Sequence, residues 1–488
     1  MYAQNSYCAA HVFPLDELSR TGTLPAQLFS VRAQRDSVFW LDSGMASESG
    51  EGWSYLGAEP VCHLELSGDR LEVWYNNGYH EVCSSSSSHL ARWLNFFRLR
   101  RESTSIKSIL QPGPRFRGGW VGYIGYDAGL HASRFAQDRF PQISLNLFDT
   151  VLAYSHADKR WWGAATLRSD VAPRSAMDIA RAKVGSLLQF LSSTPACSAP
   201  PVAIPLRDAR SNFTRHAYQQ AVSAALEYIR RGDIYQINLA QRFSTPWELT
   251  PETLYLKLRA ESPSARGVFL GRNLVGQQQA LCSITPELFL RLRGSNILTR
   301  PIKGTRVSGG TFEQNSEARL ELSRNAKERA ELNMIVDLER NDLGRVCEYG
   351  SVSVLSSGEI EELPTLLHRV AAITGRLRAR HRAYSLIKAT FPGGSVTGAP
   401  KIRAMQIIEE LETVPRGPYC GAVGWMSLDG DLELSLAIRT ALYDGTRGLV
   451  HYHAGSGIVI DSDPAREYDE TLHKAEAFFR ATNSVLKI

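Results

Sequence analysis

The sequence predicts an α+β protein built on large antiparallel β-sheets packed as a sandwich with flanking helices. Three observations support this class. The chain has 488 residues and 43% of them are hydrophobic, which is enough for more than one buried core. Short alternating apolar segments separated by turn signals fill roughly the first 190 residues. After a stretch rich in Ser, Pro and Ala at 192–205, helical periodicity appears between further strands.

The segments before this stretch alternate apolar and polar residues with the period of a strand. A hairpin turn is expected at Asn76-Asn77-Gly78, because glycine readily adopts the positive φ of a tight turn. The glycines of 118–129 follow GxxGxxG spacing rather than that of a dinucleotide loop, so they should allow close sheet packing. The expected strands are Ser37–Leu41, His63–Leu66, Leu71–Trp74 and Val151–Tyr154.

Two domains are expected, a β-rich domain at 1–195 and a second domain at 211–488, joined by a linker at 196–210. In the second domain, apolar residues at helical spacing precede Gly232, which is a good helix stop. The expected helices there are Arg215–Arg231, Arg319–Glu339 and Lys401–Glu412, and the expected strands are Ile234–Ala240, Gly421–Ser427, Glu433–Leu442 and Gly448–His453.

Charge and composition narrow the class of protein. The formal net charge is only +5, and the arginines are spread out apart from one cluster at Arg376–Arg382, so a small anionic substrate fits at least as well as nucleic acid. The seven cysteines are scattered without CxxC or metal-ligand spacing, which favours a reducing compartment. No apolar run approaches the ~18 residues of a membrane span and the N-terminus lacks a signal-peptide pattern, so a cytoplasmic protein is expected.

Lys303, in the segment RPIKGT at 300–305, is the first candidate for chemistry. A lysine amine is a nucleophile only when neutral, and it becomes neutral through burial or neighbouring charge. Pro301 and Gly304 fix the backbone on either side, as a positioned reagent requires. A turn with a solvated lysine is built in the same way, so the residues alone leave both interpretations open.

Two pairs of glutamates form the second candidate. Glu328 and Glu331 are three residues apart, as are Glu467 and Glu470, so each pair projects from one face of an expected helix. Facing pairs of this kind would suit Mg²⁺, which is bound through carboxylate and substrate oxygens and keeps some of its waters. The alternative is an ordinary set of surface ion pairs with the neighbouring cations Arg324, Lys327, Arg466 and Lys474.

Further polar residues are individually weak signals. Glu287 follows a proline, His368 lies in an apolar run where a core histidine is common, and Arg439 lies in an expected strand where a structural ion pair is common. A glycine loop occupies 453–457. The segment GGSVTGAPK at 393–401 is not a phosphate-binding P-loop, because Pro400 precedes its lysine and an isoleucine follows it.

Together these motifs resemble the chorismate-utilising enzymes, the family of anthranilate, aminodeoxychorismate, isochorismate and salicylate synthases. The resemblance covers roughly 213–487, and FWLDSG (39–44) and WSYLGAEP (53–60) resemble the amino-terminal strands of the anthranilate and aminodeoxychorismate branches. It implies a chorismate-binding fold like that of anthranilate synthase component I. The ordered motifs are GDIYQINLAQRF, TPELFL, RPIKGT, KERAELNMIVDLERNDLGRV, GGSVTGAPKIRAMQIIEELE, YCGAVGW, AIRTAL, HAGSGIV and SDPAREYDETLHKA.

Two positions distinguish the branches of this family. Members that add water to chorismate resemble one another in a lysine base at the position of Gln236, so glutamine resembles the ammonia-using branch. In that branch the PIxGT motif typically carries alanine in anthranilate synthases and lysine in aminodeoxychorismate synthases, and this chain has Lys303. The resemblance is therefore to component I of aminodeoxychorismate synthase. The alternatives are anthranilate synthase component I and, as another class, a non-catalytic ligand- or nucleic-acid-binding protein.

The resemblance also implies residue roles. Lys303 would attack C2 of chorismate and Glu287 would be the general acid for its C4 hydroxyl. Mg²⁺ would be bound by Glu331 and Glu470, with Glu328 and Glu467 holding its waters. The residues implied to bind substrate are Gln236, Thr305, His368, Ser395, Tyr419, Arg439, Gly455 and Gly457, with Ser395 in place of a more common threonine.

Partners follow from the same resemblance. No cysteine lies in a GxCxG context, so ammonia is expected from a separate glutamine amidotransferase subunit. Little sequence follows the last motif, so we expect no fused lyase and a product of 4-amino-4-deoxychorismate, on the route to 4-aminobenzoate and folate. In some members the amino-terminal strands hold tryptophan, as a feedback inhibitor or a structural ligand, which makes it a candidate ligand of the N-terminal domain. Neither nucleic acid nor membrane is expected as a partner.

Overall fold

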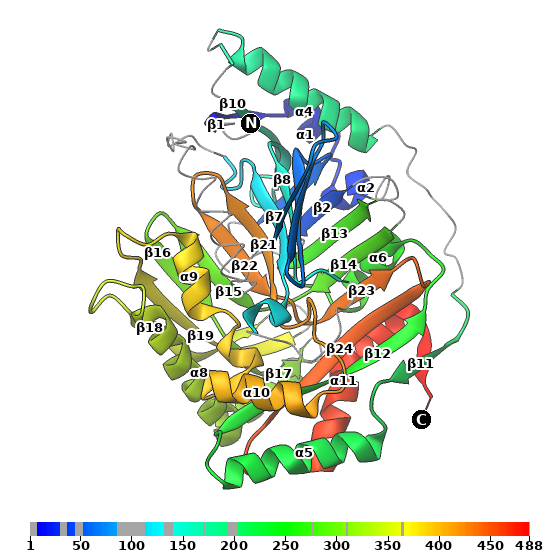
Figure 1. Ribbon diagram of the computed structural model, residues 1–488, viewed down its shortest axis with the longest axis vertical. Helices are drawn as coiled ribbons and strands as arrows, with labels where there is room; N and C mark the ends of the chain where they lie inside the picture. The colour runs from blue at the N-terminus through cyan, green and yellow to red at the C-terminus, as the bar shows by residue number, and fades with distance from the viewer. Residues whose placement is uncertain are drawn as a thin grey trace.

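Two large, mostly antiparallel β-sheets with flanking helices make up the protein, as Figure 1 shows. This confirms the predicted α+β class. The structure, a computed structural model, describes residues 7–29, 37–43, 52–84, 113–130, 140–168, 171–172, 174–192, 204–274, 277–308, 311–362 and 366–487.

The first sheet has 13 strands and combines strands from before and after the predicted linker. Residues 193–203, which hold much of that linker, lie outside the described part of the chain. In spatial order its strands are β1 (Tyr7–Pro14), β10 (Arg160–Arg168), β9 (Thr150–Ser155), β3 (Trp53–Ala58), β2 (Val38–Asp42), β13 (Gly267–Leu274), β14 (Gln277–Ile284), β23 (Thr440–Asp444), β24 (Leu449–Ile458), β12 (Gln236–Pro246), β11 (Arg207–Ser211) and β25 (Ser484–Leu486), with β20 (Gly398–Ala399) paired to β12.

The second sheet has 12 strands and also mixes both parts of the chain, since β7 pairs with β21. Of the strand pairings described in the two sheets, only that of β11 with β25 is parallel. In spatial order the strands of the second sheet are β17 (Ile302–Val307), β19 (Leu366–Arg376), β16 (Asn296–Arg300), β15 (Leu288–Arg293), β22 (Leu432–Leu436), β21 (Ala422–Ser427), β7 (Gly119–Ile124), β8 (Ile143–Phe148), β4 (Cys62–Ser67), β5 (Arg70–Tyr75) and β6 (His80–Ser84), with β18 (Ser353–Glu362) paired to β19.

Helices pack on the first sheet and on the β17, β18 and β19 end of the second sheet (Figure 1). No helix in the described ranges is both long and apolar enough to cross a membrane. The helices are α1 (Asp16–Arg20), α2 (Pro25–Phe29), α4 (Ala176–Ser192), α5 (Arg215–Arg230), α6 (Pro251–Glu261), α7 (Phe312–Arg324), α8 (Ala326–Gly344), α9 (Ala383–Thr390), α10 (Lys401–Leu411) and α11 (Pro464–Thr482), with 3₁₀ turns η1 (Tyr126–Gly129) and η2 (Gly394–Val396).

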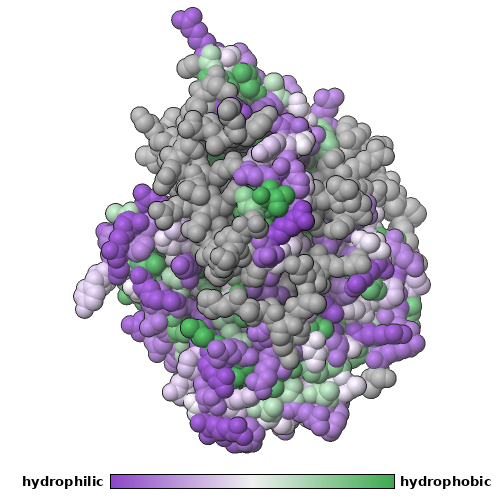
Figure 2. Space-filling view, in the orientation of Figure 1, coloured by the Kyte–Doolittle hydropathy of each residue, from purple (hydrophilic) through white to green (hydrophobic). Residues whose placement is uncertain are grey.

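Three apolar cores hold these layers together. One lies between the two sheets, where Phe39 and Leu41 of β2 meet Val121 of β7 and Val423 of β21. A second packs α4, α6 and α11 on the first sheet, and a third packs α5, α8, α9 and α10 with the second sheet and β12. The described surface seen in Figure 2 is mainly hydrophilic, with apolar residues in small separate groups. The apolar faces of the sheets are thus used for packing between layers.

Several local predictions are confirmed. Asn76-Asn77-Gly78 links β5 to β6, and Gly78 has φ 84°. In the glycine-rich segment, Gly119 and Gly122 of β7 lie so close to neighbouring backbone that an added Cβ would clash with it. The hairpin and the close sheet packing therefore arise from the local properties expected of these glycines.

Two expected elements are wrong because local backbone geometry interrupts them. The expected helix Arg319–Glu339 is divided between α7 and α8 at Asn325, whose side chain accepts a hydrogen bond from the Glu328 amide and caps the second helix. The expected strand Glu433–Leu442 is divided between β22 and β23. Arg439 lies in the break with φ 49°, which is not a strand conformation.

Candidate active site

Lys303 lies at a β-bulge on β17, the edge strand of the second sheet. The pairing register with β19 shifts at Lys303 and Gly304, and a bulge of this kind redirects the side chain it carries. Gly304 has φ 88°, and a Cβ there would lie 2.6 Å from Glu328 Oε2, so both backbone conformation and space require glycine. The half-buried Lys303 amine donates to the backbone oxygen of Ser395 at 3.1 Å.

Three polar side chains converge above Gly457 of β24. A Cβ on Gly457 would lie 3.0 Å from Gln236 Nε2, 3.6 Å from Glu331 Oε2 and 3.9 Å from Lys303 Nζ. Gln236 begins β12 and is buried, and its Oε1 has no hydrogen-bond partner among the described residues. Strand β12, helix α8 and strand β17 therefore bring a glutamine, a carboxylate and the lysine amine to one point.

Glu287 occupies the turn before β15 and is 4% exposed. Its Oε1 accepts a hydrogen bond of 2.6 Å from the hydroxyl of Ser395. Burial raises the pKa of Glu287, although the Ser395 hydroxyl, the Lys303 charge, the Ile302 amide and the Arg439 charge oppose the shift. A buried carboxyl with a raised pKa stays protonated at higher pH than an exposed one, as a proton donor requires.

The two glutamate pairs face each other from α8 and α11. Burial raises the pKa of Glu331, and the charges of Glu470 and Glu467 raise it further against the opposing effect of Lys303 and Lys327. Lys327 of α8 reaches across to Glu467 of α11 at 3.5 Å. Ion pairs with neighbouring cations were the alternative to a metal site, and one of them is present: Glu470 binds Lys474 on its own helix at 2.7 Å. Partial burial opposes the shift, but the charges of Lys474, Lys327 and Lys303 lower the pKa of Glu470, whose side chain is 46% exposed.

The chemistry of this carboxylate group fits Mg²⁺. Within the described residues, no three His, Cys, Asp or Glu side chains lie close enough together to form a ready metal site. However, Glu328 Oε2 and Glu467 Oε2 are both buried without a hydrogen-bond partner among those residues. Mg²⁺ commonly keeps several waters and takes only one or two carboxylates together with substrate oxygens, so widely set carboxylates with unsatisfied oxygens suit it.

The residues expected to bind a substrate carboxylate come from three neighbouring segments. Arg439 lies within electrostatic reach of Glu287, and burial lowers the pKa of its guanidinium while Tyr452 and Glu287 oppose this. Tyr419 is 4% exposed and stacks on His453 with ring centroids 5.0 Å apart. Gly455 lies on β24 two residues before Gly457, with its carbonyl bound by Lys474 at 2.9 Å.

Thr305 and His368 face each other across β17 and β19. Their register pairs them directly, and Thr305 Oγ1 lies 2.9 Å from His368 Nδ1. His368 is 2% exposed. The histidine is thus a buried residue fixed by a hydroxyl, in the same pair of strands that carries Lys303.

Sequence reasoning missed the polar groups that support these residues. His453, whose pKa burial lowers well below its usual value, backs Tyr419. Asp342 and Lys401 form a buried ion pair under the segment that carries Ser395. Lys401 was part of the GGSVTGAPK segment that failed the P-loop pattern, and Asp342 lies 11 residues after Glu331 on the same helix. This spacing, about three helical turns, was a signal that the sequence contained.

Comparison with known proteins identifies the family. The chain belongs to the chorismate binding enzymes, and the family matches residues 38–480.

The individual relatives divide between two enzymes of that family. The chain is 37% identical to aminodeoxychorismate synthase component 1 of Bacillus subtilis over 444 residues, which cover 90% of each protein. It is also 37% identical to anthranilate synthase component 1 of Pseudomonas aeruginosa over 472 residues, 94% of this chain and 92% of that one. The crystal structure of anthranilate synthase component I from Streptococcus pneumoniae TIGR4 matches with a TM-score of 0.72 and 27% identity, covering 93% of this chain and 97% of that one.

Proposed function

We propose that this chorismate binding enzyme is component I of an aminodeoxychorismate synthase, which converts chorismate and ammonia into 4-amino-4-deoxychorismate and water. One observation carries the proposal: a lysine amine lies near Gln236 and Glu331 and is bound to the same serine as Glu287, a buried glutamate with a raised pKa. In the resemblance described above, lysine at 303 is typical of the aminodeoxychorismate synthases and alanine of the anthranilate synthases.

In the first half of the reaction, Lys303 forms a bond to C2 of chorismate. The ring double bonds shift, and the bond from C4 to its hydroxyl breaks. Glu287 gives its proton to the departing hydroxyl, which leaves as water. The raised pKa of Glu287 keeps this proton available, and the Ser395 hydroxyl orients the carboxyl group.

In the second half, ammonia adds at C4, the double bonds shift back and the bond from C2 to Lys303 breaks. The Glu287 carboxylate takes the surplus proton of the added ammonia and is restored as an acid. Gln236 is buried beside Lys303, and its amide oxygen has no partner in the part of the chain that the structure describes, which suits it to orient ammonia or its ammonium form. Ammonia, and not water, is then the nucleophile that adds at C4.

Substrate binding follows from the charges around these groups. Arg439 offers a guanidinium fork to the enolpyruvyl carboxylate, together with Tyr419 and the backbone amides near Gly455 and Gly457. Glu331 and Glu470 would hold Mg²⁺, with Glu328 and Glu467 holding its waters, and the bound ion would supply positive charge to the ring carboxylate. Thr305 and His368 would line the ring pocket.

A glutamine amidotransferase subunit is the proposed source of ammonia. The relatives named as component 1 support this, because such a name implies a second component. The test is a mixture of this chain with an aminodeoxychorismate synthase amidotransferase subunit, glutamine and chorismate. We expect glutamine-dependent product and co-elution in gel filtration. Product from ammonium salts but none from glutamine, together with separate elution of the two proteins, would contradict this pairing.

Tryptophan is proposed as a ligand of the cavity between the two sheets. Leu41, Asp42 and Ser43 of the FWLDSG motif line it from the first sheet, and Trp425 and Glu433 line it from the second. Calorimetric titration with tryptophan should show saturable binding to the purified chain. The absence of binding heat, together with an unchanged indole fluorescence when tryptophan and protein are mixed, would contradict tryptophan binding.

The identity of the product tests the main proposal. The purified chain is incubated with chorismate, Mg²⁺ and an ammonium salt, and the product is identified by mass spectrometry. We expect 4-amino-4-deoxychorismate. Fluorescent anthranilate would favour an anthranilate synthase, and unconsumed chorismate would favour a non-catalytic binding protein.

Two tests distinguish a Lys303 that forms a bond to chorismate from a Lys303 that is only a surface charge. Lys303→Ala should lose most activity or divert the remainder toward anthranilate, whereas Lys388→Met, a change at an exposed lysine of α9, should leave kcat unchanged. Borohydride with chorismate should not inactivate the enzyme, because the proposed adduct is a secondary amine and not an imine. Wild-type kinetics in Lys303→Ala would refute the covalent role.

A further inference from the structure

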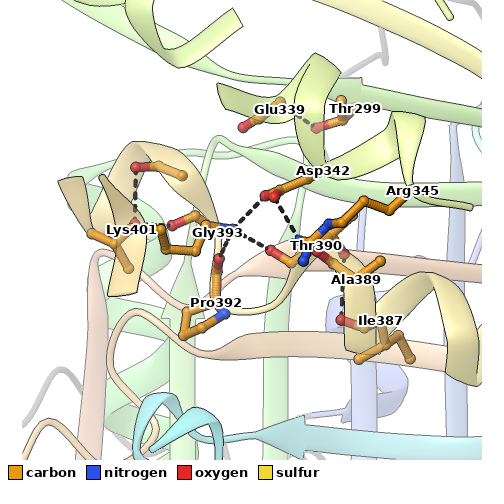
Figure 3. Close-up of polar contacts among 12 residues, drawn as sticks. Thr299, Glu339, Asp342, Arg345, Ile387, Ala389, Thr390, Pro392, Gly393 and Lys401 are labelled. Atoms are coloured by element: carbon orange, nitrogen blue, oxygen red, sulfur yellow. Dashed lines mark hydrogen bonds and ion pairs between the residues drawn. The ribbon is translucent and has the colours of Figure 1, made fainter. Parts of the chain in front are cut away.

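A buried ion pair lies beneath the segment that carries Ser395 (Figure 3). The ammonium group of Lys401, at the start of α10, donates to Asp342 Oδ2, to the backbone oxygen of Thr390 at 2.8 Å and to that of Pro392 at 2.7 Å. The side chains of Lys401 and Asp342 are 12% and 6% exposed. All three donors of the lysine are therefore used, and none is offered to a ligand.

Lys401 closes a short loop by these contacts. We call residues 391–400 the Ser395 loop; Lys401 follows its last residue, and Thr390 and Pro392 mark its beginning. The lysine thus joins the two ends of the loop, and Asp342 fixes that junction to helix α8, which also carries Glu331. Figure 3 shows Lys401 and Asp342 pointing toward each other from α10 and α8, with dashed lines that also join Lys401 to Thr390 and Pro392.

The middle of the loop rests on the same helix. A Cβ on Gly394 would lie 2.9 Å from Leu338 Cδ2, so the loop is in close contact with α8 one turn before Asp342. Ser395 projects from this point, with its carbonyl bound by the Lys303 amine at 3.1 Å and its hydroxyl bound to Glu287 at 2.6 Å. One serine thus contacts both residues to which the proposed reaction assigns bond making and proton transfer.

Further anchors make the expected effect partial. Arg416 donates to the backbone oxygen of Val396 at 2.9 Å, and β20 at the end of the loop pairs with β12, so the loop keeps these contacts without Lys401. Buried ion pairs often add little net stability relative to apolar residues of the same size. We therefore attribute the Lys401–Asp342 pair to holding the Ser395 loop in position, and not to stability alone.

We propose that Lys401 and Asp342 are positioning residues that hold the Ser395 loop, so that Ser395 orients Lys303 and Glu287 together. This inference rests on the proposed function for the roles of Lys303 and Glu287. It assigns the lysine of GGSVTGAPK a task in place of phosphate binding: it ties the loop to the helix of the metal-binding glutamates.

The first test is Lys401→Met, which keeps length and removes the charge. Chorismate consumption with Mg²⁺ and an ammonium salt is measured per folded enzyme, with folding checked by circular dichroism. We expect kcat to fall by about 100-fold, the order of loss that a displacement of about 1 Å causes, with KM changed less than about threefold. Lys388→Met on α9 is the matched control and should leave both unchanged. A fall confined to the amount of folded protein would overturn the proposal.

A double-mutant cycle separates positioning from a general structural effect. If Lys401 acts through Ser395, then Lys401→Met in a Ser395→Ala background should change kcat less than about threefold, although each change alone lowers it substantially. Full multiplication of the two single losses would mean that Lys401 acts independently of Ser395, and would overturn the proposal.

Folding failure is covered by a paired variant. Lys401→Met leaves the buried Asp342 with Arg345, at 2.7 Å, as its remaining cation, so Asp342→Asn/Lys401→Met is made as well, which removes both charges of the Lys401–Asp342 pair. The double variant should fold and show the same loss of kcat. Failure of both variants to fold would overturn the proposal, because the pair would then serve the fold. Anthranilate as the wild-type product would refute the proposed function alone and leave the cycle readable, whereas a wild type that consumes no chorismate would refute both.

Discussion

Glu287→Gln should remove the proton donor while keeping the shape and the hydrogen bond of the site. Glutamine retains a carbonyl oxygen that can accept from the Ser395 hydroxyl, now 2.6 Å from Glu287 Oε1. The side chain is only 4% exposed, so water cannot readily take its place as an acid. A positioned general acid contributes about 10²–10⁴ in rate, so we expect a loss near the middle, about 10³-fold in kcat, or about 4 kcal/mol.

The pH dependence gives the sign of the effect. Burial raises the pKa of Glu287 against the lowering effects of Ser395, Lys303 and Arg439, and the reaction requires the protonated form. Activity that depends on Glu287 is therefore present below its pKa and is lost as pH rises through it. The assay is chorismate consumption at saturating ammonia and Mg²⁺ between about pH 6 and 9.5, read as kcat. Glu287→Gln should lose the alkaline limb as well as the rate.

Glu339→Gln is the matched control. Glu339 is also a buried glutamate, hydrogen-bonded by Thr299 at 2.9 Å, and burial raises its pKa to about 8, with the Glu287 charge contributing. Its replacement removes a neighbouring negative charge, so the alkaline limb should remain and move slightly to lower pH. The reasoning is refuted if Glu287→Gln keeps kcat within threefold of wild type, or if Glu339→Gln abolishes the limb.

Three further predictions concern metal, space and stability. Glu470→Gln should raise the Kd for Mg²⁺ in calorimetric titration at least tenfold, whereas Glu476→Gln, an exposed change on the same helix, should not; equal affinities would count against the metal assignment. Gly457→Ala should lower kcat/KM at least tenfold by crowding the Gln236 amide, while Gly185→Ala, where a Cβ meets no described atom within 4 Å, should not, and equal activities would contradict the crowding. Arg416→Met should lower the free energy of unfolding by about 3–5 kcal/mol in urea denaturation, because Glu412 stays buried without its ion pair; adding Glu412→Gln should restore part of it, and a loss below about 1 kcal/mol would be inconsistent.

The fold class and most of the candidate site residues could be predicted from the sequence, because both depend on local signals. Strand period, turn glycines and ordered motifs identified the sheets and the segments around Lys303, Glu287 and the glutamate pairs. The boundaries it misplaced lie where one residue changes the backbone: the Asn325 cap that separates two helices and the positive φ of Arg439. Such local geometry is not visible in hydrophobic periodicity.

The sequence by itself determined the chemistry available: an amine at 303, an acid at 287 and an amide at 236, within motifs of one enzyme family. Only the tertiary structure decided which of these meet. The bulge at Lys303 and Gly304 and the close packing at Gly457 place the amine next to Gln236 and Glu331, and Ser395 joins it to Glu287. The buried Lys401–Asp342 pair is likewise a property of contacts between distant segments. Distances and burial between such segments follow from how sheets and helices pack, and no local pattern along the chain encodes them.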